Sequence, residues 1–500
     1  MSEIVDRIKA YTERYGIVKL CGKIVEKGTG YVRNIGKTET EKQIHEEYTF
    51  ARNPLISIIV PVYNVEHEAF KATLESVLAQ TYGNWELCVA DGGENKVDAV
   101  IDEVMGDDAR IRYVSLESNL GISGNSNQAL DVASGFLDHD DILEPDALYE
   151  AANRIVNYGA DMVYTDEDKV SPDLKRYFKP YRKPDYNKTL LLSNNYICHF
   201  SVFARELLDG TELFRPQFDG SQDHDMILRL TDRAKCVVHV PKLLYYWRCH
   251  PGSVASGVDA KPYVVEAAKG AVADHLRRHG FKHFQITSTR AFETIFKIRY
   301  EIIGTPKISI VIANKDHQSD LKRCIDSILE KSTYENYEII VVENNSTTPE
   351  IFAYYKELQT AYENGATEND RKIRVVTYTP KEGETFNYSR VNNYGVSFAT
   401  GEYILLLNND TQVITVNWME ELLMYAQRQD VAAVGAKLYY ADKTIQHAGV
   451  VLGLGAHRTA GHSHYGQHRD NLGYMGRLCY AQNVSAVTGA CLLVKKSLYD

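Results

Sequence analysis

The chain has 500 residues, with 56 Lys and Arg against 67 Asp and Glu, which gives a net charge of −11. This balance argues against a large binding surface for nucleic acid, and the length exceeds what one hydrophobic core usually supports, so we expect at least two domains. No apolar run approaches the roughly 20 residues of a membrane span, and the first residues lack a signal-peptide segment. The eight cysteines contain no C-x-x-C pair. We therefore expect a cytoplasmic protein without a disulfide or zinc framework.

The predicted elements fall into four stretches. Residues 1–53 mix short helical patterns with charge and carry no recognisable chemistry. From residue 54 to 258 strands and helices alternate, which predicts an α/β domain with a largely parallel sheet. Residues 259–306 contain a helix that ends at Gly280 and two alternating segments, expected to be linking strands. Residues 307–500 form a second α/β domain.

The second domain repeats the start of the first. Leu55–Asp91 and Lys307–Glu343 each contain a β-branched strand, a polar loop, an amphipathic helix, a turn with tyrosine and a second apolar strand. We interpret the pair as an internal duplication of a nucleotide-binding βαβ unit. The duplication predicts two sites in one chain.

An acidic residue ends the second strand of the first copy. Asp91 follows an apolar strand and precedes Gly92 and Gly93. In open α/β sheets ligands bind beyond the carboxyl ends of the strands, where a carboxylate can accept hydrogen bonds from a base or a ribose. Because Asp and Gly are also ordinary turn residues, a turn without a ligand is an equal alternative.

A second acidic cluster, Asp138-His139-Asp140-Asp141, follows a short apolar stretch. Its three carboxylates repel one another unless a cation or solvent relieves them. Hard divalent ions prefer oxygen ligands and pair with diphosphate oxygens. The cluster therefore indicates a metal site for a nucleoside diphosphate, and the alternative is a solvated turn that caps the helix expected over Pro145–Glu150.

Further motifs surround these acids in a fixed order. In chain order they read SIIVPVYN, NLGISGNSNQAL, DHD, YTDEDK, YFKP, DGSQDHDMILRL and LLYYWRCHPGS. This ordered set resembles family 2 glycosyltransferases of the GT-A fold, of the bacterial polysaccharide and O-antigen type. The resemblance covers nearly everything from Pro54 onward and implies two GT-A domains in tandem, with mixed, mostly parallel sheets, the second domain being truncated.

The resemblance also assigns roles to residues. It implies a nucleotide-sugar site, a Mn²⁺ or Mg²⁺ ion on the diphosphate and, for an inverting reaction, one carboxylate as general base. Gly92 stands where the family usually has a second acid. The assigned residues are Pro61, Tyr63, Asp91 and Asp138 for the nucleotide-sugar, Asp138, Asp140 and His250 for the metal, and Asp223 for catalysis.

Other polar residues beside these motifs have open roles. Asp225 is expected to cap or orient the helix that follows Asp223. His250 either contacts the metal or the diphosphate, or is a surface histidine. Asn195 and His199 are interpreted as buried structural residues, with acceptor contacts as the alternative.

The segment before the first acidic cluster is short. The second copy reaches its acid through Thr400–Leu407, whereas the first copy offers only Ser134–Leu137 before Asp138. The difference of about four residues corresponds to roughly 13 Å of strand. Either the preceding helix unwinds to supply that strand, or the acidic pair is displaced.

The second copy differs at its expected site. Ala313 stands in place of Pro61 and Glu343 in place of Asp91, while Asn408-Asn409-Asp410 leaves Asp410 as the clear metal carboxylate, a pattern that resembles rhamnosyltransferases. The surrounding histidines are irregularly spaced in a Gly-rich stretch, which favours a mobile acceptor loop over a metal cage. They are His447, His457, His462, His464 and His468.

The second base motif of the family would follow Asp500, so we expect this domain to bind donor poorly unless the natural protein continues. The leading interpretation is an inverting, metal-dependent glycosyltransferase that moves a sugar from a UDP- or dTDP-linked donor to a surface polysaccharide or lipid-linked glycan. We expect it in the cytoplasm, with peripheral contact to the inner membrane or to assembly enzymes. The alternatives are a degenerate scaffold that binds nucleotide-sugar, and a nucleotidyltransferase, which would need a Gly-rich triphosphate loop that PVYNVEHE lacks.

Overall fold

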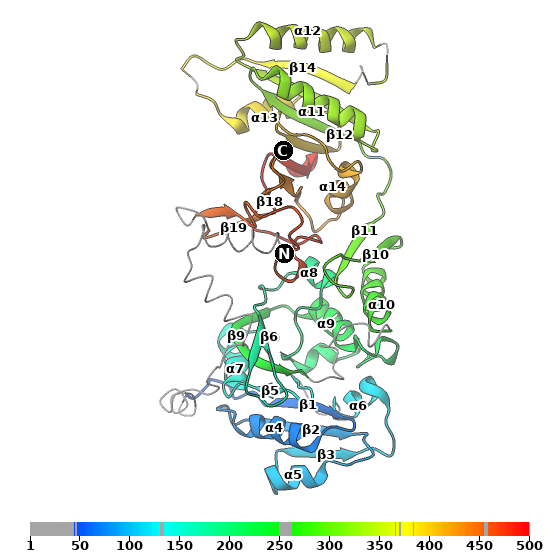
Figure 1. The fold of residues 1–500 in the computed structure, drawn as a ribbon, viewed down its shortest axis with the longest axis vertical. Coiled ribbons are helices and arrows are strands. Elements are labelled where there is room, and N and C mark those ends of the chain that lie inside the picture. The colour runs from blue at the N-terminus through cyan, green and yellow to red at the C-terminus, as the bar shows by residue number, and fades with distance from the viewer. Residues whose placement is uncertain are drawn as a thin grey trace, which may run out of the picture. The chain divides into compact units, whose positions relative to one another are not determined.

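The computed structural model describes residues 45, 48–130, 135–249, 263–365, 367–369, 372–383, 385–454 and 459–499. The chain divides into two compact units (Figure 1), one made of residues 1–280 and 292–296, the other of residues 281–291 and 297–500. The predicted boundaries near residues 53, 258 and 306 stay predictions, and most of the predicted N-terminal segment lies outside the described residues. Among those residues, none of the helices combines the length and the apolar character needed to cross a bilayer.

The first unit is built on a mixed sheet with the strand order β3-β2-β1-β4-β8-β6-β9-β5, and β7 pairs with β6. Parallel pairing joins β1 to β2 and β4, β2 to β3, and β6 to β9. The elements in chain order are β1 Ile56–Val62, α4 His67–Leu78, β2 Trp85–Asp91, α5 Asp98–Met105, β3 Ile111–Ser115, α6 Gly121–Leu130, β4 Gly135–Phe136, β5 Ile142–Leu143, α7 Ala147–Tyr158, β6 Met162–Val170, β7 Tyr177–Tyr181, α8 Lys188–Ser193, β8 Ser201–Phe203, α9 Gln222–Arg233, β9 Val237–Arg248 and α10 Tyr263–Arg278.

The second unit contains a smaller mixed sheet with the order β14-β13-β12-β15-β21-β16 and three two-stranded pairs, β10-β11, β17-β18 and β19-β20, within the described residues. Its elements, including β11, which begins in the first unit, are β10 Phe284–Ser288, β11 Phe296–Tyr300, β12 Ile308–Asn314, α11 Gln318–Lys331, β13 Tyr337–Asn344, α12 Pro349–Asn364, β14 Ile373–Tyr378, α13 Tyr388–Val396, β15 Tyr403–Leu407, α14 Trp418–Ala426, β16 Ala433–Gly435, β17 Leu438–Tyr439, β18 Ile445–His447, β19 Val450–Leu452, β20 Ala460–His462, β21 Cys491–Lys495 and α15 Lys496–Tyr499.

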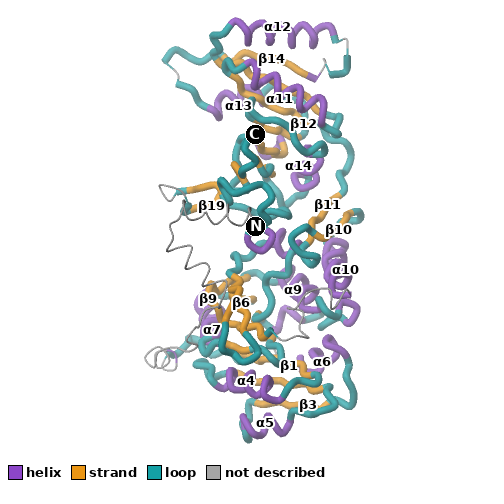
Figure 2. The backbone as a smooth tube through the Cα atoms, viewed as in Figure 1, coloured by secondary structure: helices purple, strands orange, loops and turns teal. Residues whose placement is uncertain are grey.

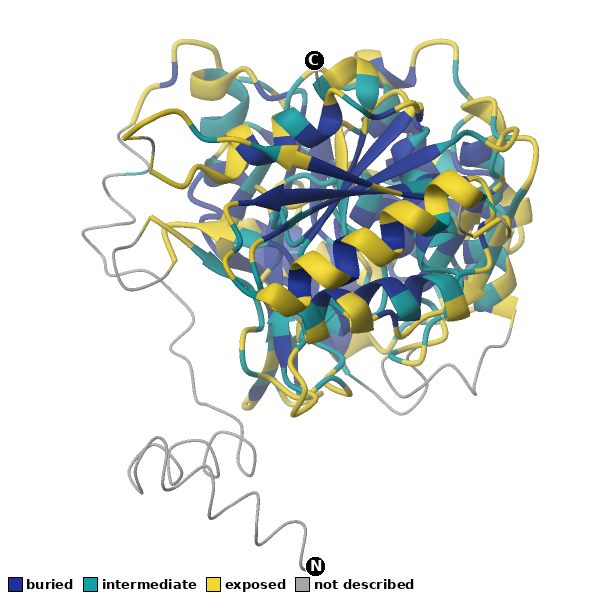
Figure 3. Cartoon of the chain, turned by 90° about the horizontal axis from the view of Figure 1, so that it is seen from above, coloured by how far each residue is buried: buried dark blue, intermediate teal, exposed yellow. Residues whose placement is uncertain are grey.

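Alternating burial explains why helices cover both faces of each sheet. In β12, Ile310 and Ile312 pack with α11 and α12, whereas Val311 packs with α13 on the opposite face. Successive side chains of a strand point to opposite faces, and a parallel sheet covered on both sides reads as a continuous apolar run. Figure 2 shows strands and helices layered in this way, and in Figure 3 the buried strands lie behind helices whose outer faces are exposed.

The duplicated βαβ unit is visible in the strand register of each copy. β1 and β2 pair in parallel from Ile56 to Val62, and β12 and β13 pair in parallel over the corresponding residues. The tyrosine of each connecting turn donates its hydroxyl to the carbonyl of the proline before the first strand, at 2.6 Å for Tyr82 and 2.6 Å for Tyr334. The same hydrogen bond closes both copies, which accounts for the tyrosine noted in the two turns.

The short approach to the first acidic cluster shortens β4 without moving the cluster. Ile59 of β1 pairs with Phe136 of β4, and the corresponding Val311 of β12 pairs with Leu406 of β15. Asp138 and Asn408 then follow two residues later in their copies. Of the two alternatives, displacement of the acidic pair is therefore wrong, and unwinding of the preceding helix would fall on residues 131–134, which lie outside the described residues. Removing four residues takes away two full pleats, so the alternation of side chains between the two faces is unchanged.

Candidate active site

A cavity of about 600 Å³ lies in the first unit, beyond the carboxyl ends of β1 and β4. It collects side chains from distant stretches of the chain, among them the loop after β1, the acidic cluster after β4 and the start of α9. The predicted site residues among its lining are Pro61, Tyr63, Asp138, Asp140, His199 and Asp223. The structure thus brings the expected metal carboxylates and the expected base to one cavity.

The loop that carries the acids is held by hydrogen bonds from neighbouring elements. The Nδ1 atom of His139 lies 2.9 Å from the carbonyl oxygen of Pro61, and the hydroxyl of Thr73 in α4 donates to the carbonyl of His139 at 3.1 Å. The third acid, Asp141, is buried; it accepts hydrogen bonds from the Tyr245 hydroxyl and, at 2.8 Å, from the backbone amide of Arg248. Asp141 therefore ties the loop to β9, while Asp138 and Asp140 line the cavity.

The acidic side chains that line the cavity repel one another. Enclosure by protein raises the pKa of Asp138, and the negative charges of Asp140 and Asp223 act in the same direction, whereas His199 opposes them. The Asp138 side chain is nevertheless exposed to the cavity space. A cation placed there would relieve the repulsion.

The expected base lies in the first turn of α9. Asp223 accepts a hydrogen bond from the Nδ2 atom of Asn195 at 2.8 Å, which orients its carboxylate. Two residues later, Asp225 is fully buried and pairs with Arg215 and Arg229, its Oδ2 lying 2.9 Å from Arg229 Nη2. Asp225 thus anchors α9, as expected, and leaves Asp223 as the carboxylate of this turn that lines the cavity.

A buried ion-pair network supports the cavity wall beside Asp138. Glu167 of β6 lies 3.0 Å from the Nζ of Lys183 and 3.1 Å from the Nδ1 of His199. Burial opposes ionisation of Glu167, but Lys183 and His199 outweigh it and lower the pKa of Glu167 to about 2. Burial likewise disfavours a charged His199, and Glu167 outweighs it, raising the pKa of His199 to about 9. The cavity therefore contains an imidazolium next to the acidic cluster at neutral pH.

Sequence reasoning assigned no role to Glu167, Lys183 or Arg248. Arg248 is buried at the end of β9, and its Nε and Nη2 atoms have no hydrogen-bond partner among the residues that the structure describes. Burial lowers the pKa of Arg248, and Asp140 and Asp141 oppose that effect. An arginine two residues before the expected His250 was the available signal. His250 itself lies outside the described residues.

Asp91 does not line this cavity. Its buried carboxylate accepts hydrogen bonds from the amides of Gly93 at 2.8 Å and Val97 at 2.9 Å and from the hydroxyl of Tyr113 at 3.0 Å. A Cβ at the next position, Gly92, would lie 2.8 Å from the Nδ2 of Asn125, so a larger residue there would require the Asn125 side chain to shift. Asp91 thus shapes the loop, and its contact with a nucleotide stays a prediction.

The carboxylate pair fits a hard divalent cation. Asp138 and Asp140 supply oxygen atoms to a cavity that also contains His199. Oxygen donors select Mg²⁺ or Mn²⁺ over softer ions. A metal between these carboxylates and a diphosphate would supply charge neutralisation to the leaving group.

The corresponding place in the second unit is chemically different. A cavity of about 650 Å³ is lined there by Asn408, Thr488 and Ala490 together with side chains of the β17–β20 region. Ala313, Glu343 and Asp410 are not part of its lining. The Nδ2 atom of Asn409 donates to Asn314 at 2.6 Å. Glu343 accepts from both the amide and the hydroxyl of Ser346, at 2.6 Å each, so its carboxylate shapes a loop as Asp91 does.

Two histidines of the second unit meet, the ring centroids of His447 and His462 lying 4.8 Å apart. His462 lines the cavity, whereas His447 is buried and burial lowers its pKa to about 4. Within the described part of the chain, the one cluster of histidine and acidic side chains with metal-ligand spacing lies elsewhere, at Asp232, His275 and His279. The preference for a mobile loop over a metal cage stays a prediction, and His457 lies outside the described residues.

Comparison with known proteins adds the family. The model of glycosyl transferase family 2 matches residues 57–210 and 309–500. The chain is 40% identical over 456 residues to the uncharacterized protein y4gI of Sinorhizobium fredii and 32% identical over 458 residues to the O-antigen biosynthesis protein RfbC of Myxococcus xanthus, covering 89% and 90% of this chain. It spans only 48% and 34% of those two relatives.

Among solved structures, TarS 1–349 of S. aureus in complex with UDP-GlcNAc shares 17% identity, with 45% of this chain and 72% of that chain covered. Its TM-score of 0.36 is too low to support an argument. The family match leads to one conclusion: the chain belongs to glycosyl transferase family 2, and its duplicated α/β units are GT-A-like.

Proposed function

We propose that the first unit transfers a sugar from a nucleoside-diphosphate donor to a glycan hydroxyl with inversion at the anomeric carbon and with the help of a divalent cation. The observation that carries the proposal is the convergence of Asp138, Asp140 and Asp223 on one cavity. Pro61 and Tyr63 lie at its edge, where the nucleotide would contact the loop after β1.

Each residue of the site has a separate role in the proposed reaction. Asp223 takes the proton of the acceptor hydroxyl as its oxygen attacks the anomeric carbon from the face opposite the leaving diphosphate. Asn195 holds the Asp223 carboxylate in place. Asp138 and Asp140 would hold Mn²⁺ or Mg²⁺, which would supply charge neutralisation to the diphosphate. The imidazolium of His199 adds a positive charge beside the same group.

The donor and the acceptor follow from chemistry and from relatives. UDP- and dTDP-linked sugars are the donors to test, and the name of the Myxococcus xanthus relative points to an O-antigen or another surface polysaccharide as the acceptor class. Such an acceptor, when lipid-linked, would place the protein at the cytoplasmic face of the inner membrane, in contact with assembly enzymes.

The test is a donor panel in which release of nucleoside diphosphate is measured with and without Mn²⁺. The wild type and an Asp138→Asn/Asp140→Asn variant are compared, with Asp173→Asn on the exposed turn before β7 as the matched control. We expect metal-dependent release from one donor in the wild type and the control, and at least a hundredfold less in the double variant. Equal release in all three proteins would refute the assigned site.

A second candidate function, that of a nucleotide-sugar-binding scaffold, is favoured by the second unit. Its Asn409 is hydrogen-bonded to Asn314, and Asp410 does not line the cavity there. Calorimetry that shows nucleotide binding without turnover over the full panel of donors and acceptors would support this alternative.

A further inference from the structure

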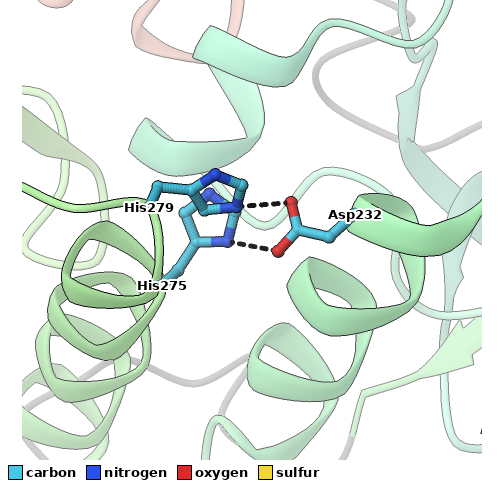
Figure 4. Close-up of side chains that lie close together, drawn as sticks. All are labelled: Asp232, His275 and His279. Carbon is cyan, nitrogen blue, oxygen red and sulfur yellow. Dashed lines mark ion pairs between the residues drawn. The ribbon is translucent and has the colours of Figure 1, made fainter.

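A histidine and aspartate cluster lies at the far end of the two helices that flank the cavity of the first unit. Asp232 belongs to the last turn of α9, His275 belongs to the last turn of α10, and His279 directly follows that helix (Figure 4). One ligand atom from each of the three residues lies within 4.8 Å of the other two. This cluster is separate in sequence from every residue of the acidic cavity.

The distances within the cluster suit a small cation. The Nε2 of His279 lies 2.8 Å from Oδ1 of Asp232, and the Nδ1 of His275 lies 3.3 Å from Oδ2. Zinc bonds of about 2.0–2.1 Å in a tetrahedral shell place neighbouring ligand atoms about 3.3 Å apart. The two imidazole rings come from positions i and i+4, and their centroids are 4.3 Å apart.

One nitrogen of the cluster lacks a hydrogen bond. His275 is 2% exposed, and its Nδ1 has no hydrogen-bond partner among the described residues, because the 3.3 Å approach to Asp232 lacks hydrogen-bond alignment. A buried polar nitrogen without a well-aligned hydrogen bond calls for an explanation. A metal bond to this lone pair would supply it.

The helices themselves favour positive charge at this place. The starts of α9 and α10 approach each other at the cavity, where the Ser221 hydroxyl donates to the carbonyl of Val264 at 3.4 Å, and both helices end at the cluster. Each carboxyl end carries about half a negative charge, to which Asp232 adds a full one. Arg278 lies 3.0 Å from Asp232 and Lys188 4.0 Å, but both are long side chains that can turn to solvent.

We propose that Asp232, His275 and His279 bind a transition-metal cation of the Zn²⁺ class, with water as the fourth ligand. A donor set of two imidazoles and one carboxylate selects such an ion, whereas the carboxylates of the cavity select Mg²⁺ or Mn²⁺. The ion joins the carboxyl ends of α9 and α10. Because Asp223 in the first turn of α9 and Tyr263 and Val264 of α10 line the cavity, the ion stabilises the helix pair that carries the cavity wall.

The experiment uses the full chain with the Asp138→Asn/Asp140→Asn background, which removes the carboxylate site. Zn²⁺ is titrated by calorimetry, and Co²⁺ is titrated while its visible d–d absorption is recorded. His279→Gln is compared with His283→Gln, an exposed histidine outside the cluster that serves as the matched control. Asp232→Asn provides a second disruption, and circular dichroism confirms that each variant is folded.

We expect the control to bind one more equivalent of Zn²⁺ than His279→Gln and Asp232→Asn, and to show the absorption of tetrahedral Co²⁺ with nitrogen ligands. A hundredfold excess of Zn²⁺ over its Kd should raise the unfolding temperature of the control by about 5 °C but not that of the cluster variants. Equal stoichiometry and equal thermal shifts in all variants would overturn the proposal and leave a hydrogen-bonded charge cluster. Failure of sugar transfer would not affect this result, because the measurement needs no donor or acceptor.

Discussion

The two units share a backbone frame and differ in the chemistry at its edge. In the first, β1 and β4 place Asp138 and Asp140 at a cavity that also contains Asp223. In the second, β12 and β15 place Asn408 at the matching register. Strand register, which is set by the buried core, is the same in both copies, whereas the side chains that follow the strands differ.

The largest expected effect comes from removing the proposed base of the first unit, which tests whether that unit contains the active site. Asp223→Asn removes the proton acceptor but keeps the hydrogen-bonding shape, so we expect transfer to fall by about 10²- to 10⁴-fold with donor binding nearly unchanged. Initial rates at saturating donor, together with calorimetric donor binding, measure both quantities. A rate within threefold of the wild type would locate the active site elsewhere, the second unit being the next candidate.

The next largest effect is expected on metal-dependent binding of UDP, which should differ between the two units. Asp140→Ala should weaken Mn²⁺-dependent UDP binding by at least tenfold, because a carboxylate that lines the cavity is lost. Asp410→Ala should change it less than twofold, because Asp410 is not part of the lining of its cavity. Calorimetry with UDP, with and without Mn²⁺, measures both variants. The reverse ranking would assign the metal site to the second unit.

His199 in the first unit and His447 in the second should contribute to the pH dependence of folding stability in opposite directions. His199 has a pKa of about 9 in the folded protein against about 6.5 unfolded, so its stabilisation is complete below about pH 6.5 and is lost as the pH rises through 9. His447 has a pKa of about 4, so its contribution is complete above about pH 6.5 and is lost as the pH falls through 4.

Urea denaturation of the wild type, His199→Gln and His447→Gln at several pH values, without added metal, tests this pair. We expect His199→Gln to remove about 1–3 kcal/mol of the stability lost between pH 6.5 and 9, and His447→Gln to reduce the loss between pH 6.5 and 4. Parallel pH profiles for all three proteins would mean that neither histidine is linked to folding.

The smallest effect concerns the short strand. Inserting Glu-Tyr-Ile-Leu, the sequence of residues 402–405, between Gly135 and Phe136 should extend β4 alongside Ile56 and Ser57 without changing which side chains face the core. We expect a gain of about 1 kcal/mol in the free energy of unfolding. A Gly-Ser-Gly-Ser insertion at the same place is the control and should give no gain. Equal destabilisation by both insertions would show that β4 is already complete at two residues.

Much of the fold could be predicted from residue patterns. The β-branched runs, the helical period and the repeated turn tyrosine predicted the two βαβ units, because these features act between neighbours in the chain. The helix ending near Gly280 and the linking strands at residues 284–288 and 296–300 were likewise anticipated, since helix ends and alternating segments are local signals.

The functional geometry depended on contacts between residues far apart in the chain. Spacing alone could not show that Asp141 accepts a hydrogen bond from Tyr245 while its neighbours line a cavity. Nor could it show that the buried carboxylate of Asp91 accepts hydrogen bonds from the loop that follows it. Nor could it place Asp232 beside His275, which belongs to a different helix and is separated from it in the chain by β9. Local periodicity therefore predicts the strands and helices. Tertiary packing decides which carboxylates lie close together, because side chains from distant parts of the sequence become neighbours only in the folded protein.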